Sequence, residues 1–449
     1  MLREIASNSY NLPPILHDSD EHEQTQVDVN QSMRDLVIKY MTIADETSPT
    51  FGDFGSEDQA IMTRSNSEPV VSYHGYLKQE SSQVYEKLNQ ALKPFNRYAL
   101  FRENVGNASN PHRIDIIDGL LPDAPPRRSW WNLGLFILTV LAVFFTGAQQ
   151  ATTELGLLEA VSDNTIASII VIGENIWRGY PYALSIMLIL IAHELGHFIM
   201  MRWHGLKATL PYFIPAPILT PFGTLGATIL LDDVIKNRKV LLDIGVAGPI
   251  AGFVVSVPLV IYGLSISEIV PLSTSGYLEG NSLMYLFAKI VALGQIYPTP
   301  EQDVLLSQVA FAGWTGLLLT MMQMIPLGQL DGGYVLYALF GEKARWAFLP
   351  VMLIFVGITI ITSQLVWIAF LLLLLFIGRF YAVPLDNITP LDATRKFVAG
   401  IALVIFVLTF VPMPFVPVED SLFTQDNASI ILVIGLIVLP RLLSSKLRR

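Results

Sequence analysis

The chain has no cysteine among its 449 residues, and only 15% of its residues are charged. Without cysteine there is no disulfide and no thiolate ligand, so histidine and carboxylate side chains would have to hold any bound metal. Hydrophobic residues make up 52% of the chain, and its mean hydropathy is +0.50. An average soluble domain carries about 25% charged residues. This composition therefore indicates that most of the chain lies in a membrane.

Basic residues are scarce in the first part of the chain. Residues 1–126 contain 19 Asp and Glu against 10 Lys and Arg, so this part holds nearly all of the net charge of −10. Nucleic acid binding requires a positive surface, which an acidic segment does not provide. We therefore expect no nucleic acid partner.

The N-terminal residues also lack the apolar core of a secretory signal peptide. Residues 1–70 contain few aromatic and many polar side chains, which predicts a mostly disordered acidic tail with a short helix near residues 31–41. The pattern of apolar and polar residues at 71–126 predicts a small α+β cytoplasmic domain followed by a proline-rich linker. Its expected elements are strands at 70–77, 97–103 and 112–118 and a helix at 81–95.

Residues 127–449 contain apolar segments separated by polar loops, typical of an α-helical polytopic membrane protein. Some segments are shorter than the ~20 residues that a spanning helix needs, so their ends are approximate. We expect about eight transmembrane helices. The segments are 130–147, 181–203, 241–264, 304–325, 346–361, 364–381, 398–415 and 428–443.

Basic residues predict the orientation of these helices. Arg127 and Arg128, and the basic residues near positions 202–207, 236–239, 343–345, 379–396 and 441–449, all fall on one side of an eight-helix arrangement. Cytoplasmic loops carry an excess of Lys and Arg. Both termini are therefore expected in the cytoplasm. The chain is therefore expected to be an integral protein of a bacterial plasma membrane, in contact with lipid.

One charged residue stands out in the second apolar segment. Glu194 is the only fully charged residue between Gly179 and Met201, and it lies in the motif His193-Glu194-Leu195-Gly196-His197. The pattern HExxH places two imidazoles one helical turn apart, where both can bind one Zn²⁺, with the glutamate beside the metal as a base. An ionisable side chain at membrane depth indicates function.

A third metal ligand is needed to complete such a site. Two soluble zinc protease patterns are excluded, since neither a histidine at position 203 nor a glutamate soon after Glu194 is present. The remaining candidates are Asp232, Asp233, Asp243, Asp331 and Asp386. Asp331 is favoured because proline and glycines interrupt an apolar segment just before it, and broken helices in membranes line buried or watery sites. His204 is better explained as an interfacial residue.

These motifs resemble the site-2 protease family of intramembrane zinc metalloproteases, in its bacterial and plastid form. HELGH at 193–197 and Leu330-Asp331-Gly332 match the family in order. Two further segments match between them, FGTLGA at 222–227 and AGPIAGF at 247–253 after Asp243. The first resembles a membrane-embedded, re-entrant β-type segment. The specific likeness covers residues 127 to about 340.

The resemblance implies an enzyme that hydrolyses peptide bonds within or near transmembrane helices of membrane-protein substrates, during regulated intramembrane proteolysis. The basic loops place the active site toward the cytoplasm, because His193 and His197 lie near the end of the second apolar segment. His193, His197 and Asp331 would bind zinc, and Glu194 would be the catalytic base. Gly223, Thr224 and Gln323 would contact substrate.

Gln323 departs from the family, which has asparagine at this position. This departure leaves open a catalytically weak or inactive membrane scaffold of the same fold. A membrane transporter is a further alternative, although no internal repeat is evident. The sequence does not indicate an oligomeric state.

Overall fold

The computed structural model describes residues 31–104, 107–121, 130–161, 163–217, 219–229, 231, 233–273, 276–362 and 365–418. By its internal contacts the chain divides into two compact units. The first comprises Met1–Asp53 and Asn66–Leu120, and the second comprises Phe54–Ser65 and Leu121–Arg449.

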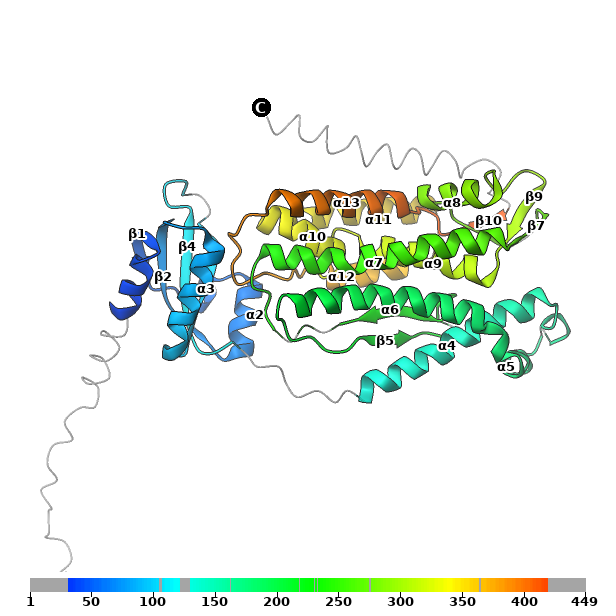
Figure 1. Ribbon diagram of the computed structural model, residues 1–449, viewed down its shortest axis with the longest axis horizontal. Helices are drawn as coiled ribbons and strands as arrows, with labels where there is room; N and C mark the ends of the chain where they lie inside the picture. The colour runs from blue at the N-terminus through cyan, green and yellow to red at the C-terminus, as the bar shows by residue number, and fades with distance from the viewer. Residues whose placement is uncertain are drawn as a thin grey trace, which may run out of the picture. The chain divides into compact units, whose positions relative to one another are not determined.

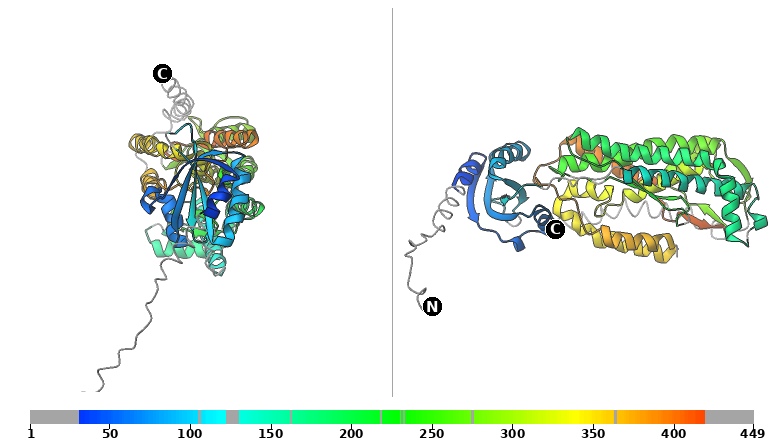
Figure 2. Two further views of the ribbon diagram at one scale, coloured as in Figure 1. Left: turned by 90° about the vertical axis from the view of Figure 1, so that its left-hand side faces the viewer. Right: turned by 90° about the horizontal axis from the view of Figure 1, so that it is seen from below.

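The first unit is built on an antiparallel sheet with strand order β1-β2-β4-β3 (Figure 1). Its strands are β1 (Met41–Thr47), β2 (Glu68–Leu77), β3 (Arg97–Glu103) and β4 (His112–Asp118). Helix α3 (Ser81–Leu92) continues into the turn η2 (Lys93–Phe95) and packs on β3. Val84, Leu88 and Leu92 are fully buried at the four-residue spacing that places side chains on one face of a helix. Figure 2 shows this sheet, in blue, from two further sides.

The expectation of a mostly disordered segment at 1–70 is wrong for residues 41–65. β1 pairs with β2 through Ile43 and Gly75, and the turn η1 (Phe51–Asp53) and helix α2 (Ser56–Ser65) follow it. β1 is an edge strand with mostly exposed side chains, so it lacks the alternation of apolar and polar residues that reveals a strand in a sequence. Residues 31–38 are helical, as expected, and residues 1–30 lie outside the described part.

The second unit is mainly helical, as expected for a membrane protein. Figure 1 shows α6, α7 and α13 running side by side. Its α-helices, besides α2, are α4 (Trp130–Glu154), α5 (Thr165–Glu174), α6 (Tyr180–Trp203), α7 (Arg238–Ser265), α8 (Leu283–Leu293), α9 (Gln308–Gln323), α10 (Asp331–Phe340), α11 (Phe348–Thr362), α12 (Leu365–Ile377) and α13 (Ala393–Thr409). Short 3-10 turns are η3 (Glu159–Val161), η4 (Ile176–Gly179) and η5 (Gly341–Ala347).

Four helical segments of the described residues are long and apolar enough to cross a membrane: Trp130–Glu154, Ile176–Trp203, Arg238–Ser265 and Asp331–Thr362. α9, α12 and α13 occupy three further predicted spans but are shorter. The predicted span at 304–325 begins too early, because Val304 and Leu305 belong to strand β9. The predicted span at 428–443 lies outside the described residues.

Short antiparallel strand pairs complete the second unit. β5 (Tyr212–Pro215) pairs with β6 (Thr224–Thr228), which confirms a β-type element within the predicted segment after α6. The Tyr182 hydroxyl, from α6, donates a hydrogen bond to the Phe222 carbonyl at 2.9 Å and so fixes this hairpin against the helices. The other pairs join β7 (Glu268–Pro271) to β9 (Gln302–Leu305), and β8 (Tyr277–Glu279) to β10 (Phe415–Pro417).

Candidate metal centre

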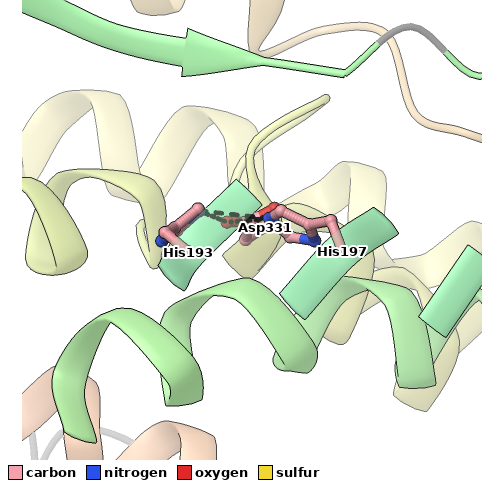
Figure 3. A group of neighbouring side chains, drawn as sticks. All are labelled: His193, His197 and Asp331. Atoms are coloured by element: carbon pink, nitrogen blue, oxygen red, sulfur yellow. Dashed lines mark hydrogen bonds and ion pairs between the residues drawn. The ribbon is translucent and has the colours of Figure 1, made fainter. Parts of the chain in front are cut away.

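Three side chains from two helices meet inside the second unit (Figure 3). His193 and His197 lie one turn apart on α6, and Asp331 is the first residue of α10. The two Nε2 atoms are 3.1 Å apart, and each lies 3.3 Å from Asp331 Oδ2. All three residues are at least 91% buried, since their exposed fractions are 8%, 8% and 9%. Among the described residues they form the only group of three or more potential metal ligands.

The geometry of this triangle fits zinc. Ligand atoms about 2.0–2.2 Å from a tetrahedral zinc lie roughly 3.3–3.5 Å from one another, which is close to the distances of 3.1 and 3.3 Å found here. Asp331 Oδ2 is buried and makes no well-oriented hydrogen bond among the described residues, although both imidazole Nε2 atoms lie 3.3 Å away. A buried carboxylate oxygen without such a bond is costly unless a cation compensates it. Two imidazoles and one carboxylate also leave the fourth position open, as in catalytic zinc sites.

The backbone of α7 orients one of the two imidazoles. His197 Nδ1 lies 2.9 Å from the carbonyl oxygen of Ile244. When Nδ1–H donates to this carbonyl, the Nε2 lone pair remains free for the metal. This backbone partner was not predictable from the sequence, because it depends on how α6 and α7 pack.

Glycines of α7 make room for both rings. A Cβ at Gly248 would come within 2.6 Å of His197 Cε1, and a Cβ at Gly252 would lie 3.2 Å from His193 Nδ1. The two glycines have the same four-residue spacing as the two histidines, so each ring has a glycine facing it. The sequence alone did not reveal this role, although the matching spacing of the two glycines and the two histidines was a signal for it.

The position of Asp331 depends on a break in the helical chain. α9 ends at Gln323, and the following turn contains Pro326 and Gly328, whose φ of +54° favours glycine. Gly333 then packs so closely on this turn that a Cβ there would lie 2.6 Å from the carbonyl carbon of Leu327. The break therefore returns the chain toward α6 and starts α10 at the ligand, as the broken apolar segment predicted.

The other candidate ligands have different partners. Asp233 accepts a hydrogen bond from the Lys207 amide at 2.6 Å. Asp386 accepts from the amides of Ile388 and Thr389, both at 3.1 Å. Asp232 lies outside the described residues.

The remaining candidate, Asp243, contacts His204 at 2.9 Å. His204 follows α6 as its C-cap residue.

Glu194 lies between the two histidines on α6 and is 3% exposed. Its Oε2 atom is buried and has no hydrogen-bond partner among the described residues. A buried carboxylate oxygen that no protein donor satisfies is available for a water molecule or a reacting group.

The residues expected to contact substrate have different environments. Gly223 has a φ of +74° at the start of β6. Thr224 is fully buried, and its hydroxyl donates to the Ile214 carbonyl at 2.9 Å and accepts from the Gly226 amide at 3.0 Å. Its side chain therefore shapes the hairpin. Gln323 is half-buried at the end of α9.

Comparison with known proteins supports this geometry. The model of peptidase family M50 matches residues 181–363, which include all three ligands. The chain is 32% identical over 408 residues to the probable zinc metalloprotease EGY1, chloroplastic, of Arabidopsis thaliana, covering 85% of this chain and 70% of that protein. It is 25% identical over 390 residues to the probable zinc metalloprotease EGY2, chloroplastic, of the same plant, covering 84% and 65%.

A rice (Oryza sativa subsp. japonica) protein named probable zinc metalloprotease EGY1, chloroplastic, is 25% identical over 411 residues, covering 85% of this chain and 67% of that protein. No solved structure matches the chain. With two histidines and an aspartate arranged for zinc inside an apolar helical unit, the chain belongs to peptidase family M50, the site-2 protease family of intramembrane zinc metalloproteases.

Proposed function

We propose that Glu194 is the catalytic base of this protease. The observation that carries the proposal is its buried Oε2 atom, which has no hydrogen-bond partner in the described part of the chain and belongs to the residue next to the ligand His193. Bound zinc supplies Lewis acidity, which polarises a water molecule and a peptide carbonyl. Glu194 accepts a proton from the attacking water and then donates it to the amide nitrogen of the leaving peptide, so that the C–N bond breaks and no net charge is left behind.

The substrates are proposed to be membrane proteins that are cut within or near a transmembrane helix, in regulated intramembrane proteolysis. α6 is apolar over most of its length and carries the ligands in its last three turns, so a substrate reaches the site from within the bilayer. A helical segment must unwind before a base and a water can reach its peptide bond.

The hairpin β5–β6 offers an edge for the unwound segment. Among the described residues, β6 pairs with β5 alone, and Leu225 on β6 is 59% exposed. An extended peptide can add to such an edge through backbone hydrogen bonds. Gly223 and Thr224 would then act by shaping the hairpin, because the Gly223 amide and carbonyl already bond to Thr220 and Ala216. Gln323 would contact substrate through its side-chain amide.

The proposed topology has eight transmembrane helices, with both termini and the zinc site on the cytoplasmic side of a bacterial plasma membrane. The charge distribution supports this orientation, since the loops near Lys207, Lys239 and Lys343 are basic. The named relatives are chloroplast proteins. A chloroplast membrane is therefore the second proposed location.

Cleavage of a membrane-spanning reporter tests this function. The purified full-length protein is placed in lipid vesicles with a single-span substrate, and the products are weighed by mass spectrometry. Cleavage inside or next to the spanning segment, abolished by a zinc chelator, is the expected result. If the protein cuts only the soluble flanking parts, the proposed substrate class is wrong.

A catalytically weak scaffold is the second candidate function, and Gln323 in place of the family asparagine is the observation that favours it. Binding of the reporter without cleavage, in protein that retains one zinc per chain, would support this alternative.

A further inference from the structure

Asp243 joins three helices near the zinc site. It lies in the second turn of α7, and its carboxylate makes a bidentate contact with Arg395 of α13. Arg395 Nε donates to Oδ1 at 2.9 Å, and Nη2 donates to Oδ2 at 2.7 Å. His204 Nε2, at the end of α6, lies 2.9 Å from the same Oδ2. The three side chains are only 17–28% exposed, so water screens these contacts less than at a free surface.

The same stretch of α7 also contacts a zinc ligand. Ile244, the neighbour of Asp243, accepts the hydrogen bond from His197 Nδ1. α6 is therefore attached to α7 at two polar points, at His197 and at His204. The two attachment points on α7 are consecutive residues, so the position of the Asp243 carboxylate and that of the Ile244 carbonyl are not independent.

We propose that Asp243 is a positioning residue for the zinc ligand His197, held in place by Arg395 and His204. The guanidinium of Arg395 matches a carboxylate through two parallel hydrogen bonds, which fixes the start of α7 in rotation as well as in distance. A shift of this turn would move the Ile244 carbonyl away from His197 Nδ1. It would also move Gly248 relative to the ring that it faces.

The proposal gives α13 a role in the metal site. The family model ends at residue 363, whereas Arg395 lies in the first turn of α13, which begins at Ala393. Asp392, the N-cap of α13, accepts a hydrogen bond from the Arg395 amide at 2.9 Å and also contacts its guanidinium. Arg395 is thus anchored on its own helix and extends to α7.

Zinc binding by the full-length protein tests the proposal without measuring proteolysis. The rate of zinc release to a chelator and the visible spectrum of the Co²⁺-substituted protein are recorded in detergent. Because partners of metal ligands typically contribute about 10–100-fold to metal affinity, Asp243→Asn is expected to weaken zinc binding at least about 10-fold and to change the Co²⁺ bands.

Asp233→Asn is the matched control. Its carboxylate accepts a hydrogen bond from the Lys207 amide and is not part of the contacts among Asp243, Arg395 and His204, so zinc release should stay within about twofold of wild type, well below the effect expected of a lost ligand partner. His204→Gln retains a donor for Asp243 and should bind zinc better than His204→Leu.

The proposal is overturned if Asp243→Asn releases zinc at the wild-type rate, or if Asp233→Asn weakens binding equally. If Asp243→Asn does not fold, Arg395→Lys is the variant that tests the proposal. It keeps the positive charge but cannot form the two parallel hydrogen bonds to Asp243. Faster zinc release from Arg395→Lys with an unchanged melting temperature supports positioning, and unchanged release overturns it. The zinc site itself is tested separately, through its ligands.

Discussion

Gly248 lies directly against the imidazole of His197, so that a methyl group at this position would come within 2.6 Å of Cε1 and 2.5 Å of Cδ2. Both distances are too short for non-bonded carbon atoms. Either the ring or the helix has to move if the glycine is replaced, and each movement displaces a zinc ligand.

We therefore expect Gly248→Ala to lower zinc affinity by about 5- to 100-fold, because overpacking by one methyl group costs roughly 1–3 kcal/mol and about 1.4 kcal/mol is tenfold in an equilibrium constant. Zinc content after dialysis against a metal buffer measures the effect. Gly400→Ala is the control, since Gly400 lies on α13 with open space around its Cα. Equal zinc content in the two variants would show that the ring of His197 tolerates the extra atom.

Glu194→Gln should abolish proteolysis and leave zinc bound. The substitution keeps the size of the side chain and removes only the oxygen that accepts a proton, while all three ligands remain. Loss of a general base lowers rates by about 10²–10⁴-fold. Reporter cleavage and zinc content are measured on the same sample, and a variant that loses its zinc would show that Glu194 has another role.

Asp331→Ala should lose zinc, whereas Asp233→Ala should retain it. Only Asp331 lies within 3.3 Å of both histidine Nε2 atoms, while Asp233 contacts the Lys207 amide. Elemental analysis of the two purified proteins compares them directly. Full zinc occupancy in Asp331→Ala would move the third ligand elsewhere.

Gln323→Ala should reduce cleavage by about 2- to 10-fold with unchanged zinc content, since a lost substrate hydrogen bond costs roughly 0.5–1.5 kcal/mol. Gln323→Asn restores the amide that the family carries and should be at least as active as wild type. If both variants cleave as well as wild type, Gln323 makes no contact with substrate.

The proposed orientation predicts which loops face the cell exterior. The chain has no cysteine, so single cysteines can replace the exposed residues Lys207, Glu301 and Lys343. A membrane-impermeant thiol reagent should label only Glu301→Cys in intact cells and all three after lysis. Labelling of Lys207→Cys or Lys343→Cys in sealed cells would place the zinc site on the opposite side.

The ligands His193, His197 and Asp331 could be predicted from sequence because local spacing and membrane context report them. The four-residue spacing in HExxH places both histidines on one face of a helix. Pro326 and Gly328 mark the position where an apolar segment ends. The sequence did not show that Asp243 pairs with Arg395, or that Ile244 orients His197. Both contacts join residues that are distant in the chain, so they follow from helix packing.

In the N-terminal region, prediction of each strand depended on whether its side chains are buried. β3 and β4 were predicted with their observed bounds because both carry runs of buried apolar residues. β1 escaped prediction because its side chains are mostly exposed and its stability comes from backbone pairing with β2. A strand of this kind is visible only once its partner is known.

The separation of Asp331 from the histidines along the chain has a consequence for biosynthesis. All of α7, α8 and α9 is translated between His197 and Asp331. A nascent protease that has emerged only through α9 therefore carries its glutamate and two ligands but cannot complete the metal centre. Peptide hydrolysis therefore has to wait until Asp331, the first residue of α10, has been synthesised.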